Sequence, residues 1–109
     1  MYLLQDMYKY LDMSFSITEY IKRNIFLFKS FNNVYLFGSI LNNNTIPNDI
    51  DILLIYSEYS YKIQQDFIAI SSVLEKEFGL PVDLTVLSTN EERETKFLDR
   101  LNDGAEKVV

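Results

Sequence analysis

Residues 34–55 read VYLFGSILNNNTIPNDIDILLI, and this stretch decides how the rest of the chain is interpreted. An apolar run ends in Gly38-Ser39, an uncharged connection follows, and a second apolar run begins with Asp49 and Asp51. Both runs have the length of strands, and Asp is disfavoured inside strands. Because residues two apart in a strand point to the same face, the two carboxylates lie about 7 Å apart at Cα. A hard divalent cation is the obvious compensation for such a pair.

Each part of this pattern also has a plain structural explanation when it is read alone. Asp49 and Asp51 fit a solvated strand entrance after a Pro-Asn turn, with one Asp capping the turn. Asp83 follows Pro81 near the start of a later apolar run, which fits a turn or surface residue. A Gly-Ser junction is common between a strand and a helix. Read together, three carboxylates on adjacent strands opposite a Gly-Ser helix N-terminus have one coherent chemical use.

That use is the metal-assisted transfer of a phosphate-containing group. Turn amides and helix N-termini hold phosphates. Three carboxylates hold two Mg²⁺ ions about 3.5–4 Å apart, and these ions clamp the attacking and leaving oxygens of an in-line displacement. A carboxylate beside one metal also takes the proton from the attacking hydroxyl. The chain has no His and no Cys, so His bases, thiolate nucleophiles and zinc sites built on those residues are excluded.

The composition suits one small domain over residues 1–109, with N-terminal helices in 1–30 and the core of the fold in 33–105. Hydrophobic residues make up 48% of the chain and charged residues 24%, which excludes an intrinsically disordered protein. A net charge of −6 argues against a protein that grips long nucleic acid by its phosphates. The first residues lack signal-peptide features, and Asn and Pro interrupt the uncharged stretch 31–48. We therefore expect no membrane span and a cytoplasmic protein.

Hydrophobic periodicity and capping signals predict an α+β fold, a small mixed β-sheet backed by helices. Capping boxes at Ser16 and Ser88 open two of the helices, and Ser39 is the expected N-cap of a short one. Gly79 and Gly104 end helices. The expected elements are a helix in 3–11, a helix over 16–28, a strand over 34–37, a short helix from 39, a strand over 50–56, a helix over 61–78, a strand over 82–87, a helix over 88–101 and an edge strand over 106–109.

Three motifs of this chain resemble those of the DNA polymerase β-like nucleotidyltransferase superfamily. They are Phe37-Gly38-Ser39, Asp49-Ile50-Asp51 with the apolar run that follows it, and Val82-Asp83-Leu84. Within the superfamily the chain is similar to the minimal nucleotidyltransferases (MNT proteins) of bacteria and archaea, over roughly residues 20–105. The resemblance implies a polymerase β-like fold in which residues 33–105 form the catalytic core.

The resemblance also implies a role for each matching residue. Gly38 and Ser39 would hold the phosphates of ATP or another nucleoside triphosphate. Asp49 and Asp51 would bind both Mg²⁺ ions, and Asp83 would ligate one ion and activate the acceptor hydroxyl. The expected reaction transfers a nucleoside monophosphate, with AMP from ATP as the expected group, to a hydroxyl of a protein partner. In such proteins that partner is commonly a HEPN-domain ribonuclease toxin, which the MNT protein neutralises as its antitoxin, in a homo- or hetero-oligomer.

Departures from the family pattern keep two alternatives open. Relatives usually place a small residue and then a Gly after the Gly-Ser, where this chain has Leu41 and Asn43, and the connection to Asp49 looks one residue short. The loop also lacks Arg, and Lys22 and Arg23 fit a solvated helix face better than the site. One alternative is a catalytically weak or inactive binding module that acts by protein–protein contact. The other is nucleotidyl transfer to a small molecule. The tyrosines at 56, 59 and 61 fit packing better than a role as acceptors.

Overall fold

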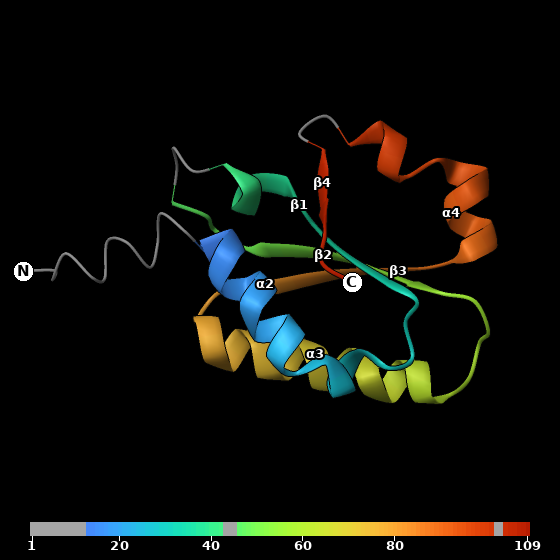
Figure 1. Cartoon of the computed structure of the whole chain (residues 1–109), viewed down its shortest axis with the longest axis horizontal. Coiled ribbons are helices and arrows are strands. Elements are labelled where there is room, and N and C mark those ends of the chain that lie inside the picture. Colours follow the sequence, from blue (N-terminus) through green and yellow to red (C-terminus); the bar gives the residue numbers. More distant parts are fainter. Residues whose placement is uncertain (1–12, 43–45, 102–103) are drawn as a thin grey trace, which may run out of the picture.

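A four-stranded mixed sheet carries the candidate residues in the computed structural model, which describes residues 13–42, 46–101 and 104–109. The strand order is β3-β2-β1-β4 (Figure 1). β1 pairs antiparallel with β2 and with β4, whereas β2 and β3 run parallel. The strands are β1 Asn33–Phe37, β2 Ile50–Tyr56, β3 Val82–Ser88 and β4 Ala105–Lys107. With its helices, the sheet confirms the predicted α+β class.

Three α-helices and three short 3₁₀ helices complete the described chain. α3 links the parallel strands β2 and β3, as a parallel crossover requires. The helix predicted within residues 3–11 lies outside the described residues. Among the described helices, none combines the length and the apolar composition needed to cross a membrane. The helices are α2 Met13–Arg23, η1 Ile25–Phe28, η2 Gly38–Leu41, α3 Lys62–Phe78, α4 Thr89–Thr95 and η3 Leu98–Arg100.

The main core lies between one face of the sheet and the helices α2 and α3. Ile50, Ile52 and Leu54 alternate along β2 and therefore share this face, where they are completely buried. They belong to one cluster with the apolar stripes of α2 and α3, which lie together on one side of the strands (Figure 1). Asp51 alternates with these residues and so points to the opposite face, which we call the carboxylate face. The packing of the helices thus leaves the candidate residues on the other side.

Two of the predicted N-caps are wrong. Ser16 lies inside α2, because the buried stripe of Met13, Ile17 and Ile21 carries the helix back beyond it. Ser39 is the second residue of η2, whose N-cap is Phe37 without a side-chain cap hydrogen bond. The helix starts one residue early because Gly38 itself makes the turn out of β1, with φ +78°. In both places packing or backbone geometry prevailed over a local cap signal.

Near the C-terminus, the predicted helix over 88–101 is too long. α4 ends at Thr95, and Lys96 adopts the left-handed conformation (φ 52°) with its N–H donating to the Glu92 carbonyl at 2.8 Å. The chain then turns into η3. The start was predicted correctly, since Ser88 forms a complete capping box with Glu91. Gly79 likewise ends α3 in the left-handed conformation, as predicted.

Candidate functional site

The three predicted carboxylates converge at the start of the two parallel strands. Asp51 and Asp83 are direct partners in the β2–β3 register, and Asp49 precedes β2 by one residue. One carboxylate oxygen from each side chain lies within 4.8 Å of those of the other two. Asp49 and Asp51 are half-buried and Asp83 is exposed, so the cluster opens to solvent on the Asp83 side. The structure therefore brings together the residues that the sequence pattern selected.

Strand pairing fixes where Asp49 lies. The Ile50 N–H donates to the Pro81 carbonyl at 2.9 Å, which ties the beginning of β2 to the beginning of β3. Pro47, two residues before Asp49, is buried, so the end of the preceding connection is held in the fold. These backbone contacts place Asp49 beside the carboxylates of Asp51 and Asp83.

Gly38 closes the site from the β1 side. Phe37 pairs with Asp51 across the two antiparallel strands, so the turn at Gly38 comes directly against the Asp51 carboxylate. A Cβ atom at Gly38 would overlap Asp51 Oδ2 and lie 3.2 Å from Cγ. The positive φ of Gly38 also disfavours any L-residue there. Ser39 follows as an exposed residue of η2, which buried Ile40 anchors to the core.

Negative charge accumulates in this cluster. Burial raises the pKa of Asp51 above its ordinary value of 3.8, and the neighbouring charges of Asp49 and Asp83 raise it further. Deprotonated Asp51 is therefore costly in the protein alone, and a cation would remove that cost. The donors are carboxylate oxygens, the ligands that Mg²⁺ and Ca²⁺ prefer at about 2.0–2.6 Å. Oxygens within 4.8 Å of one another fit such an ion, so the residues present suit a hard divalent metal.

An aromatic pair borders the carboxylates. Phe37, the β1 partner of Asp51, meets Phe97 edge-to-face with ring centroids 5.6 Å apart. Phe97 follows the left-handed turn at Lys96 that ends α4. The sequence reasoning missed Phe97, because the predicted helix ran straight through it and no local signal marked the reversal. Through Phe37, the pair lies on the β1 side of Asp51.

Other predicted candidates lie away from the carboxylates. Lys22 and Arg23 are exposed residues at the end of α2, on the opposite face of the sheet. Tyr56 is five residues along β2 from Asp51, which is about 17 Å of strand. Tyr59 and Tyr61 lie beyond it, 64% and 74% exposed. None of these tyrosines is placed to accept a group transferred at the carboxylates of its own chain.

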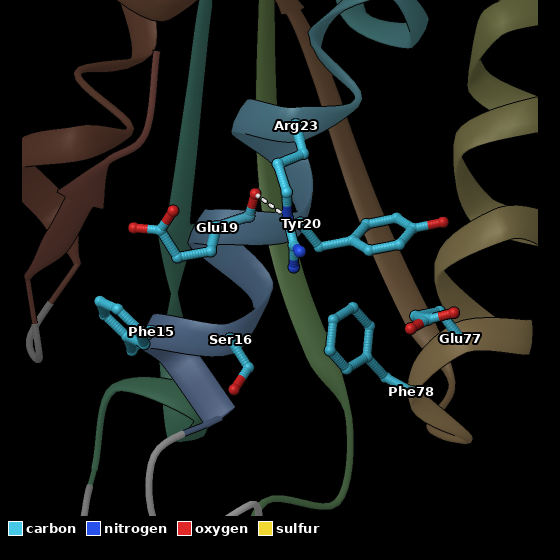
Figure 2. Close-up of a pocket in the computed structure, with 7 residues that line it drawn as sticks. All are labelled: Phe15, Ser16, Glu19, Tyr20, Arg23, Glu77 and Phe78. Atoms are coloured by element: carbon cyan, nitrogen blue, oxygen red, sulfur yellow. Dashed lines mark hydrogen bonds between the residues drawn. The ribbon is translucent and has the colours of Figure 1, made fainter.

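A separate hollow lies between α2 and the end of α3 (Figure 2). It has a volume of about 560 Å³, and Tyr20 meets Phe78 edge-to-face in its wall. None of the three carboxylates lines it, and both helices cover the face of the sheet opposite the carboxylate face. The hollow is therefore not the cleft of the candidate site. Its lining residues are Phe15, Ser16, Glu19, Tyr20, Arg23, Glu77 and Phe78.

Comparison with known proteins gives a family match that spans the site. The family model described as "Nucleotidyltransferase domain" matches residues 17–106, which include all five predicted site residues. A crystal structure of a proposed nucleotidyltransferase from Sulfolobus solfataricus is similar, with 23% identity and a TM-score of 0.43. The alignment covers 95% of this chain and 83% of that chain. A comparison with curated proteins gives no match.

Proposed function

The chain belongs to the nucleotidyltransferase domain family. On that premise we propose that it transfers a nucleoside monophosphate, namely AMP from ATP, to a hydroxyl of a protein partner. One observation carries the proposal. One carboxylate oxygen from each of Asp49, Asp51 and Asp83 lies within 4.8 Å of the other two, and the Asp51 carboxylate lies directly against the Gly38 turn. A nucleotidyl transfer needs this pairing of a metal-binding cluster with a phosphate-binding turn.

Each residue has a distinct task in the proposed reaction. Asp49 and Asp51 would hold divalent metal, with Asp83 as a further ligand. Gly38 lets the backbone approach the triphosphate, and the N–H groups around Ser39 would bind its oxygens. When bound, Mg²⁺ neutralises charge at the transferred phosphorus and orients the attacking and leaving oxygens. Asp83 is the exposed carboxylate, so it is placed to accept the proton of an incoming hydroxyl. The new phosphodiester bond forms as the bond to pyrophosphate breaks.

The acceptor in this proposal is a hydroxyl, such as that of tyrosine, on another protein. The exposure of Asp83 leaves the site open to a macromolecule. Of the chain's own tyrosines considered above, Tyr56 lies at the far end of β2, and Tyr59 and Tyr61 lie beyond that strand. The similarity to MNT proteins points to a HEPN-domain ribonuclease toxin as the partner. Modification of its tyrosine would neutralise the ribonuclease and make this chain an antitoxin.

A labelling experiment tests the proposal. The protein is incubated with Mg²⁺, each of the four α-³²P-labelled nucleoside triphosphates in turn, and the product of the neighbouring gene. We expect label on that partner, and no label with the Asp49→Asn/Asp51→Asn double variant. Adding the chelator EDTA should also abolish labelling. If no nucleotide labels the partner while the double variant still neutralises it, the enzymatic proposal is wrong.

One feature favours a second candidate function, a binding module with weak or no catalysis. η2 is only four residues long, and it carries half-buried Leu41 where relatives have small residues. A less open turn would bind triphosphate weakly. In this version the unmodified chain neutralises its partner by surface contact, and the double variant does so equally well. Transfer to a small molecule would instead give a labelled small product in the same assay, without label on protein.

A further inference from the structure

We propose that the free edge of β3 and the adjoining side of α3 form an interface between two copies of this chain, related by a twofold axis. β3 is an outer strand of the sheet, with β2 as its single strand partner in the described chain. It is seven residues long and contains one charged residue, Asp83. Long edge strands with few charges are sites of strand pairing unless something protects them.

The backbone hydrogen bonds define how much of this edge is open. Ile50 donates to the Pro81 carbonyl in a parallel ladder, so alternate residues of β3 bond to β2 and the others face outward. The outward residues are Val82, Leu84, Val86 and Ser88. Glu75 Oε1 already accepts from the Val82 N–H at 3.1 Å, and Glu91 Oε1 accepts from the Ser88 N–H at 2.9 Å. Within the described part of the chain, the open N–H groups are therefore those of Leu84 and Val86.

The outward-facing backbone groups of β3 can pair with those of a second β3 strand when Thr85 of each copy lies on the twofold axis. If two β3 strands pair antiparallel with Thr85 on the axis, Leu84 of each copy lies opposite Val86 of the other. Both positions face outward, so each pair exchanges two N–H···O=C bonds, giving four in all. A register shifted by one residue would set outward groups against groups already bonded to β2. A register shifted by two would set Leu84 or Val86 opposite Ser88 or Val82, whose N–H groups already donate to glutamate side chains. The register centred on Thr85 therefore makes the fullest use of the open N–H groups of both copies.

An apolar surface on α3 adjoins the same edge. Phe67 is 37% exposed and Ile68 is 67% exposed, and both line an open hollow of about 400 Å³ that reaches Val86 of β3. Ile63 and Gln64 complete the lining. Exposed apolar side chains beside an open edge strand are the usual composition of an interface centre.

Ile68 is the residue of α3 that lies level with the proposed twofold axis. Glu75 lies level with Val82, since its side chain accepts from that N–H. Thr85 is three residues along β3 from Val82, or about 10 Å. The antiparallel helix covers that distance in about seven residues at 1.5 Å each, which leads from Glu75 back to Ile68. The exposed Ile68 side chains of the two copies would therefore pack against each other at the axis.

Charge and polarity match across this axis. The stripe that contains Ile68 continues to Tyr61 in one direction and to Glu75 in the other, each seven residues away. The two α3 helices run antiparallel, so Tyr61 and neighbouring Lys62 of one copy face Glu75 of the other. A hydroxyl donor and a positive charge thus meet a carboxylate. For a chain of net charge −6, such a surface is where two copies approach with little repulsion.

The proposed dimer leaves the transfer site usable. Asp83 lies on the carboxylate face, away from α3, and the twofold pairing sets Leu87 of the second copy opposite it on β3. Leu87 of the second copy thus becomes an apolar neighbour of the site, which stays open to solvent. The interface does not depend on catalysis, so the Asp49→Asn/Asp51→Asn variant should dimerise like the wild type.

Sedimentation equilibrium from 1 to 500 µM tests the proposal, with Ile68→Arg as the disrupting variant. The control is Phe26→Arg, because Phe26 is a 60% exposed aromatic residue of η1, which is not part of the proposed interface. We expect the wild type and Phe26→Arg to dimerise alike, and Ile68→Arg to dimerise at least about tenfold more weakly. A wild type that stays monomeric throughout, or a dimer that Ile68→Arg leaves intact, overturns the proposal.

Amide hydrogen exchange provides a second readout that does not depend on a variant. The Leu84 and Val86 N–H groups should exchange slowly at high protein concentration and fast at low concentration. The Thr85 N–H, which bonds to β2, should be protected at both. Fast exchange of Leu84 and Val86 within the dimer would overturn the strand pairing even if dimerisation itself is observed.

Discussion

The backbone of Gly38 lies so close to the carboxylate of Asp51 that a side chain at position 38 would overlap Oδ2. Gly38 directly follows β1, and Asp51 is the β2 partner of Phe37, the last residue of β1, so the sheet register creates this contact. The glycine therefore combines two functions. It makes the left-handed turn toward η2, and it leaves space for the Asp51 carboxylate in the acidic cluster.

Gly38→Ala should slow nucleotidyl transfer. The new methyl group must displace the Asp51 carboxylate or the turn, and misplacement of a reacting group by about 1 Å costs on the order of 10²-fold in rate. We expect nucleotidyl transfer to fall by at least about that factor. Rates of label transfer at saturating Mg²⁺, measured beside the wild type, provide the comparison.

Gly79→Ala is the matched control for that variant. Gly79 also has a positive φ, at 68°, but a Cβ there would meet no atom within 4 Å. The variant should lose about 1–2 kcal/mol of stability from backbone strain and keep its transfer activity. Equal loss of activity in both variants would mean that the Gly38 effect comes from backbone strain and not from the contact with Asp51.

Asp51→Asn should stabilise the metal-free protein while it abolishes transfer. The substitution keeps the shape of the side chain and removes a charge that burial and two neighbouring carboxylates disfavour. Relief of charge repulsion typically gives about 0.5–2 kcal/mol. Urea unfolding in EDTA measures the change. A destabilised Asp51→Asn protein would contradict the electrostatic description of the site.

The raised pKa of Asp51 also predicts a pH dependence. The folded protein binds this proton more tightly than the unfolded chain, whose carboxyl titrates near 3.8. The contribution of Asp51 to stability is therefore most favourable below that pH and declines as the pH rises through the raised pKa. The stability advantage of Asp51→Asn over wild type in EDTA should grow across this window and then level off. An advantage that does not change with pH would refute the prediction.

Loss of the capping box of α4 should lower the stability of the protein and leave the rate of nucleotidyl transfer nearly unchanged. Ser88 Oγ accepts from the Glu91 N–H at 3.0 Å, and Glu91 Oε1 accepts from the Ser88 N–H at 2.9 Å. Loss of such a cap in Ser88→Ala costs about 1 kcal/mol. Chemical unfolding should detect that loss, and the transfer rate should stay within about twofold of the wild type. A large loss of activity would show that α4 contributes to the site directly.

Much of the architecture could be predicted from the sequence because its signals are local. Ser88 with Glu91, Gly79 after a periodic helix, and Asp49 and Asp51 before an apolar run each act within a few residues. The family was predicted from Phe37-Gly38-Ser39, Asp49-Ile50-Asp51 and Val82-Asp83-Leu84, and the match over residues 17–106 confirmed it. The convergence of Asp83 with the other carboxylates followed from parallel pairing of adjacent strands.

The features that could not be predicted depend on contacts between distant parts of the chain. Ser16 carries a cap signal, but a buried stripe that begins at Met13 overrides it. Phe97 reaches Phe37 because the chain reverses at Lys96, a left-handed residue that no sequence pattern marks. The overlap between a Gly38 side chain and Asp51 likewise exists only once β1 and β2 are in register.

The central claim is that Asp49, Asp51 and Asp83 hold the metal for nucleotidyl transfer. Its most direct test is anomalous diffraction from crystals grown with Mn²⁺ and a nonhydrolysable ATP analogue, with Asp51→Asn crystals as the control. We expect peaks between the three carboxylates, with the triphosphate against Gly38 and Ser39, and no peak there in the variant. Crystals in which the analogue and Mn²⁺ bind away from these carboxylates, or in which the wild-type cluster stays without a peak, would contradict the claim.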